Sequence, residues 1–149
     1  YLNDIVRPAI DEGAKTRGAT VDDMSLYSPV FVITGNDQHE MDKLEKTVRQ
    51  QISFYATTPS YGAVLNHHGY GDLGKKLAGL MREGKMDEMG RAIPEDFLEQ
   101  VAVIGAPGEI GERLRQRYDG VLDRVSLYMT MGGDADFSDW PTLIKQIHS

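Results

Sequence analysis

The sequence predicts an α/β fold in which parallel strands alternate with helices. Two apolar, β-branched runs of strand length, at residues 24–34 and 123–129, carry this prediction together with the amphipathic helical stretches around them. The first run becomes continuously apolar and β-branched toward its end, which is typical of a strand that is buried on both faces of a parallel sheet. The order helix, strand, long helical segment, strand, helix therefore indicates consecutive βα units.

The first predicted helix covers residues 1–13, where apolar residues recur at helical spacing. Pro8 falls inside this pattern and either kinks the helix or marks its first turn. The chain begins at Tyr1, already within the pattern, and we expect it to be a fragment. In the strand that follows, Pro29 is expected near the start or at an unpaired position, because proline cannot donate to the ladder.

Residues 35–37 are expected to form a turn, and Asn36 or Asp37 can cap a long helix over residues 38–55. Residues 56–71 are rich in Thr, Pro, Gly and Tyr and predict an ordered loop with a short helix. The remaining predicted helices cover residues 72–93 with an interruption at Gly84, 94–102, 107–120 and 140–147. Residues 103–105 lead to a turn, and Pro107 takes the favoured first helical position.

Two strands make a very small sheet, and each parallel strand would have neighbours on both sides. We therefore expect the other strands to be missing from this chain or to come from another chain.

Composition excludes several classes of protein. The chain has 16 Lys and Arg against 23 Asp and Glu, a net charge of −7, which argues against a nucleic-acid-binding surface. Its longest apolar run, at residues 30–33, is far shorter than the roughly 20 residues of a membrane span. Cysteine is absent, which excludes disulfides and thiolate metal sites and fits a reducing compartment. We expect a soluble cytoplasmic protein that binds neither membrane nor nucleic acid.

Four stretches carry a family likeness: SPVFVITG at residues 28–35, FYATTPSY at 54–61, HGYGDL at 68–73, and VIGAPGEI at 103–110 followed by DRVSLY at 123–128. In this order and spacing they resemble the C-terminal region of luciferase-like monooxygenases, specifically the branch that uses the deazaflavin coenzyme F420. The resemblance implies that residues 1–149 are the C-terminal portion of a single TIM-type (β/α)8 barrel domain. This portion would have about two parallel strands, like strands seven and eight, and a helical insertion over residues 72–104.

The resemblance also implies an oxidoreductase that transfers hydride between coenzyme F420, or alternatively FMN, and a small organic substrate. Much of the family's cofactor pocket and its usual catalytic residues would lie outside this chain, so no catalytic residue is assigned. The alternative is a non-catalytic oligomerisation or interaction module formed by the incomplete barrel. We expect a homo-oligomer or association with the missing half of the barrel.

Active sites of such barrels lie in the loops after the strands, which selects the candidate residues for coenzyme or substrate binding. They are the strand-end residues Thr34 and Met129 and the loop residues Tyr61, His67, His68 and Tyr70. A histidine there could contact a ligand or donate a proton, because its pKa lies near neutrality, and a tyrosine could stack on a flavin ring. The structural alternatives also stay open: hydrogen bonding of one histidine within the loop, and packing of the loop by its tyrosines.

Two further motifs are weak. Gly105, Gly108 and Gly111 follow an apolar run, but Pro107 stands where a dinucleotide-binding turn needs its second glycine. The glutamates that follow would repel phosphate. His67 and His68 are adjacent, whereas metal ligands on a helix are usually spaced, so no metal site is expected.

Overall fold

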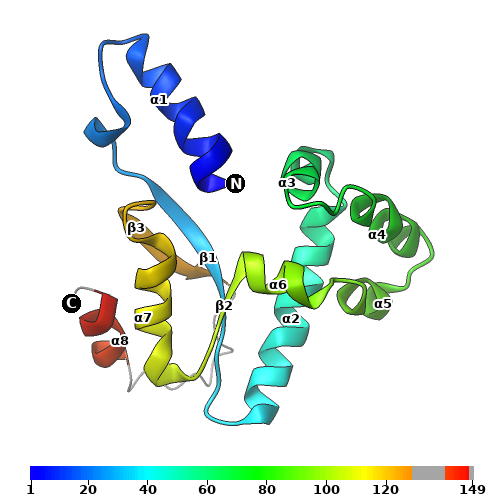
Figure 1. Cartoon of the computed structure of the whole chain (residues 1–149). Helices are drawn as coiled ribbons and strands as arrows, with labels where there is room; N and C mark the ends of the chain where they lie inside the picture. The colour runs from blue at the N-terminus through cyan, green and yellow to red at the C-terminus, as the bar shows by residue number, and fades with distance from the viewer. Residues whose placement is uncertain (129–139, 148–149) are drawn as a thin grey trace.

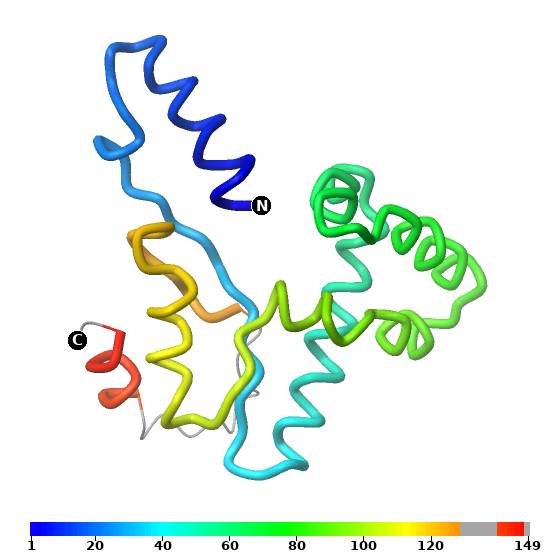
Figure 2. Tube along the Cα trace, viewed as in Figure 1, coloured from blue at the N-terminus to red at the C-terminus, as the bar shows by residue number. Residues whose placement is uncertain are grey.

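The computed structural model describes residues 1–128 and 140–147, which form a three-stranded parallel sheet with helices on both faces (Figures 1 and 2). Strand β1 (Tyr27–Ile33) is central and pairs in parallel with β2 (Ala102–Ile104) on one side and β3 (Arg124–Tyr128) on the other. The predicted α/β class and both predicted strands are confirmed.

The expected number of two strands was wrong, because β2 is a third. We expected residues 94–102 to be helical and residues 103–105 to lead to a turn. Helix α6 ends at Val101, and Ala102 is already extended, with φ −121° and ψ 149°. Three apolar residues are too few to show a periodicity, and their strand conformation depends on pairing with Phe31–Ile33 of β1.

Helices α2 and α7 lie on opposite faces of the sheet (Figure 1). The chain passes from β1 to β2 on one side, then returns across β1 to β3 on the other side. Crossovers of the same hand that run in opposite directions place their helices on opposite faces. This order differs from that of three consecutive barrel strands, in which β2 would lie between β1 and β3.

The N-terminal helix begins as a π-helical turn, Leu2–Val6, and continues as α1 (Arg7–Lys15). Pro8 occupies the first turn of α1, so of the two expectations for this proline the first-turn position is confirmed. A short 3₁₀ turn, Val21–Asp23, leads into β1 and has a capping box between Thr20 and Asp23.

Helix α2 (Gln38–Ala56) follows β1 and begins as predicted. The Asp37 carboxylate accepts a hydrogen bond from the Glu40 amide at 2.9 Å, which identifies Asp37 as the N-cap. Val48, Ile52 and Ala56 of α2 are buried in the larger core, together with Ile33 of β1.

The helical excursion beyond α2 consists of short helices. They are the 3₁₀ turn Pro59–Tyr61, α3 (Gly62–His67), α4 (Leu73–Arg82), α5 (Met86–Arg91) and α6 (Glu95–Val101). Gly84 interrupts this series as predicted, with φ +73°, a conformation that favours glycine. Buried side chains of α4, α5 and α6, among them Leu77, Met89 and Leu98, join the α2 core.

The opposite face of the sheet carries the second core, in which Val30, Val32 and Val103 pack against Ile110 and Leu114 of α7 (Pro107–Tyr118). Pro107 begins α7 as predicted, and α8 (Trp140–Ile147) packs beside it. Within the described residues, no helix combines the length and the apolar character that spanning a membrane requires.

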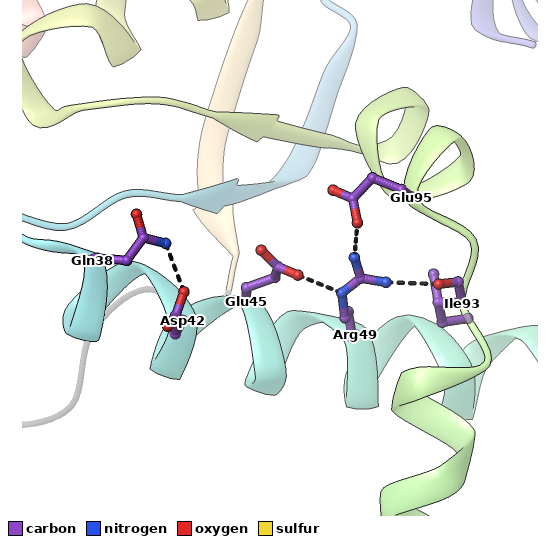
Figure 3. A network of polar contacts seen from close by, with 6 residues as sticks. All are labelled: Gln38, Asp42, Glu45, Arg49, Ile93 and Glu95. Atoms are coloured by element: carbon purple, nitrogen blue, oxygen red, sulfur yellow. Dashed lines mark hydrogen bonds and ion pairs between the residues drawn. The ribbon is translucent and has the colours of Figure 1, made fainter.

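An arginine ties α2 to the turn before α6 (Figure 3). The Arg49 guanidinium donates to the Glu45 carboxylate and to the Ile93 carbonyl, both at 2.6 Å, and pairs with Glu95. The Arg49 side chain is only 14% exposed, so this network holds the excursion against α2 at a partly buried point.

Candidate functional site

A cavity of about 650 Å³ lies on the α2 face of the sheet. Several elements contribute to its walls: the first turn of the chain, β1, the C-terminal half of α2, α3, α6 and the end of β3. Its volume is in the range of small-molecule sites in proteins, and most of its lining is aliphatic or aromatic.

Three tyrosines and a phenylalanine form one wall of the cavity. The hydroxyls of Tyr55 and Tyr128 lie 2.6 Å apart and share a hydrogen bond. The Tyr61 ring stacks on Tyr55, with centroids 5.5 Å apart, and Phe31 meets Tyr128 edge-on at 5.3 Å. The hydrogen bond to Tyr55, followed by burial, raises the pKa of the Tyr128 phenol, which keeps it protonated.

His68 lies in the lining of the cavity, next to Phe97 and Gln100. Its ring meets the Phe97 ring at 6.2 Å, and its side chain hydrogen-bonds to Gln100. Burial is the largest cause that lowers the pKa of His68, because it disfavours the charged imidazolium. His68 is therefore a neutral, polar group in a mainly apolar lining at neutral pH.

The cavity has little charge to offer a ligand. Among the described residues that line it, the charged groups are the Asp4 carboxylate, the Arg117 guanidinium and the Tyr1 amino group, which lies 3.9 Å from the Asp4 carboxylate. The Arg117 guanidinium is already engaged, donating to the carbonyl oxygens of Ala102 at 2.6 Å and Glu99 at 2.8 Å. Within residues 1–128 and 140–147, no cluster of His, Cys, Asp or Glu is placed to hold a metal ion.

The predicted site residues fall into two places. Tyr61 and His68 line the cavity, whereas His67 and Tyr70 lie beside it. His67 is 3.2 Å from the Asp4 carboxylate. The Tyr70 ring packs on Phe97 at 4.8 Å, and a hydrogen bond to Asp96 raises the pKa of its phenol.

Thr34 lies apart from the other candidates, directly after β1 and before α2. Tyr61 and His68 follow the far end of α2, whose 19 residues span about 28 Å. Thr34 Oγ1 is buried and has no hydrogen-bond partner in the described structure. Met129 lies outside the described residues.

Sequence reasoning missed the tyrosine pair, although both tyrosines lay in elements that it predicted. Tyr55 is the last residue of the predicted helix over residues 38–55, and Tyr128 lies in the second predicted strand. Their contact joins residues 73 positions apart and depends on the β1–β3 pairing, which places Tyr128 opposite Phe31. No local pattern indicated this contact, because Tyr55 lies on a helix and Tyr128 on a strand.

Comparison with known proteins identifies the family of the chain. Residues 3–124 match the family model of the luciferase-like monooxygenases. An uncharacterized protein of Mycobacterium tuberculosis (Rv1360) and one of Mycobacterium bovis (Mb1395) are each 37% identical over 125 residues, which are 84% of this chain. The chain spans 37% of the length of these relatives. No solved structure matches the chain. With the family model covering most of its residues, the chain belongs to the luciferase-like monooxygenase family.

Proposed function

We propose that this chain acts as part of an oxidoreductase that uses coenzyme F420, or alternatively FMN, to transfer hydride to or from a small organic substrate. Membership of the luciferase-like family supports the oxidoreductase class. The preference for F420 rests on the sequence stretches that resemble that branch. In the whole protein this chain would form the C-terminal portion of the barrel.

The aromatic cavity is the observation that carries the proposal. Its apolar lining and the Tyr55–Tyr61 stack fit a flat ring. They do not fit the phosphate of FMN or the anionic tail of F420, because Arg117 is engaged with backbone carbonyls and the Tyr1 amino group is paired with the Asp4 carboxylate. We therefore assign the cavity to the substrate. The coenzyme, when bound, would supply the redox chemistry from a site formed largely by other parts of the protein.

The candidate residues take different proposed roles around the substrate and the coenzyme. Tyr61 and His68 would form substrate walls, and His67 and Tyr70 would support them through their contacts with His68 and Phe97. Thr34 would contact substrate or coenzyme at the carboxyl end of β1, where open α/β sheets bind ligands. Its unpartnered, buried hydroxyl supports this assignment. Met129 stays a proposal of the same kind at the end of β3.

Coenzyme titration of the protein that contains this chain tests the proposal. We expect saturable binding of F420 or FMN, followed by absorbance, and oxidation of the reduced coenzyme by a small carbonyl compound. A Tyr61→Ala change should raise the substrate KM and leave the coenzyme Kd unchanged, since Tyr61 belongs to the substrate wall. Failure of both coenzymes to bind would refute the proposed function.

A second candidate function is the interaction module. Among the described residues β3 pairs only with β1, and a groove of about 870 Å³ runs beside it between α7 and α8. An open strand edge is a template for pairing with a further strand. Light scattering would distinguish this candidate, since it requires stable assembly of a protein that binds neither coenzyme.

A further inference from the structure

We propose that the Tyr55–Tyr128 hydroxyl pair is a recognition site for a carbonyl oxygen, and that the cavity selects neutral, planar carbonyl compounds such as quinones and aromatic ketones. The inference rests on the proposed function only in taking this ligand as the substrate. The hydroxyls, the ring walls and the charges of the cavity each contribute one part of the argument.

The hydroxyl pair has a hydrogen to donate. Each phenol carries one O–H donor, and the 2.6 Å contact between Tyr55 and Tyr128 uses one of the two hydrogens. Within the described residues, this contact is the hydrogen bond that each hydroxyl makes. The second hydrogen is directed to a cavity with a mainly apolar lining, where a carbonyl oxygen of a ligand can accept it in place of water. The raised pKa of Tyr128 keeps its hydroxyl protonated and therefore able to donate.

The surrounding aromatic rings favour a planar ligand. Tyr61 stacks on Tyr55 with an interplanar angle of 29°, and Phe31 lies edge-on against Tyr128, so aromatic surface flanks the hydroxyl pair. Aromatic side chains in this arrangement favour offset-stacked or edge-on contact with another ring. A carbonyl group on a planar ring therefore satisfies the donor and the walls together.

The charged groups of the cavity favour a neutral ligand. The Arg117 guanidinium donates to two backbone carbonyls, burial favours neutral His68, and Asp4 is an acid at the cavity wall. The Tyr1 amino group, the other cation of the lining, lies 3.9 Å from the Asp4 carboxylate. A carboxylate or phosphate would lose its hydration here and would compete with Asp4 and the backbone carbonyls for cations that are already paired. Anionic ligands are accordingly disfavoured, and this separates the substrate from the coenzyme.

The test measures binding of menadione, a neutral planar quinone, and of methylnaphthalene, which has the same rings without carbonyls. Equilibrium dialysis suits both probes, and the chain has no cysteine with which a quinone would react. We expect menadione to bind more tightly than methylnaphthalene. The change Tyr55→Phe with Tyr128→Phe should weaken menadione binding roughly three- to tenfold, the loss of about one hydrogen bond, and leave methylnaphthalene binding unchanged.

A matched control is Tyr27→Phe, because the Tyr27 hydroxyl bonds to Ser126 at 2.8 Å away from the cavity lining. This variant should bind menadione like the unchanged chain. Retained methylnaphthalene binding shows that the double variant is folded. Should the double variant not fold, the inference is tested by the unchanged chain, which should bind menadione more tightly than methylnaphthalene.

Equal affinity for the two probes, or a double variant that binds menadione normally, would overturn the inference. Competition between FMN and menadione for the cavity would overturn the substrate assignment while the proposed function stands. Absence of coenzyme binding, with carbonyl-dependent menadione binding intact, would refute the proposed function and leave the recognition site in place.

Discussion

Removing the Arg49 guanidinium should destabilise the fold more than removing the guanidinium of Arg115, which pairs with a carboxylate on its own helix. Arg49→Met keeps the apolar stem of the side chain but deletes the donors to the Ile93 carbonyl, Glu45 and Glu95 (Figure 3). The Ile93 residue is only 2% exposed, so its carbonyl loses a charged donor at a buried position. Such a hydrogen bond contributes roughly 1.5–3 kcal/mol, and each exposed ion pair about 0–1 kcal/mol. We expect a loss of about 2–4 kcal/mol in the free energy of unfolding.

Urea denaturation followed by circular dichroism measures this loss. The matched control is Arg115→Met, since the Arg115 side chain is 39% exposed and donates to the Glu112 carboxylate, three residues away on the same helix. That change should cost less than about 1 kcal/mol. Equal losses for the two variants would show that Arg49 contributes no more than a surface ion pair and would contradict this prediction.

Three other predictions concern the start of α2 and the cavity. Asp37→Ala removes the cap of the Glu40 amide and should cost about 1 kcal/mol in urea denaturation, whereas Asp37→Asn should cost less. Gly35→Ala should lower the midpoint of thermal unfolding, because its Cβ would lie 2.8 Å from the Met41 backbone nitrogen; an unchanged midpoint would contradict this packing. The pKa of folded His68 is lowered, so the unfolded chain binds more protons as the pH falls through about 6.5, and stability should decrease there. His68→Gln should flatten the decrease between about pH 7 and 5.5, and an equally steep decrease in that variant would exclude His68 as its source.

Much of the fold follows from local sequence pattern. The N-cap at Asp37, the break at Gly84 and the start of α7 at Pro107 each depend on the conformational preference of a single residue. The apolar runs of β1 and β3 were equally local signals. Strand β2 was not predictable in this way, because Ala102–Ile104 is short and its strand conformation comes from pairing with β1.

The site was less predictable than the fold. Tyr61 and His68 were recognised as loop residues of interest, and the structure places both in the lining of one cavity. Thr34 was expected in the same region but lies at the other end of α2. The helix separates Thr34, which precedes its first residue, from Tyr61 and His68, which follow its last residue. The Tyr55–Tyr128 contact needs the tertiary arrangement of α2 and β3, and no local pattern encodes it.

The strand order could not be predicted from the sequence. Helices on both faces follow from the return of the chain across β1, which the alternation of strands and helices does not specify. The same alternation suits an open sheet and a barrel, so the family likeness, and not the element order, was the source of the barrel expectation.

A crystal structure of this chain with menadione would show directly whether the cavity binds a neutral, planar carbonyl compound at its tyrosine pair. We expect the ring between the cavity walls, with a carbonyl oxygen at about 2.6–3.0 Å from the Tyr55 or Tyr128 hydroxyl. A ring bound elsewhere, or bound in the cavity with both carbonyls turned away from the two hydroxyls, would contradict it.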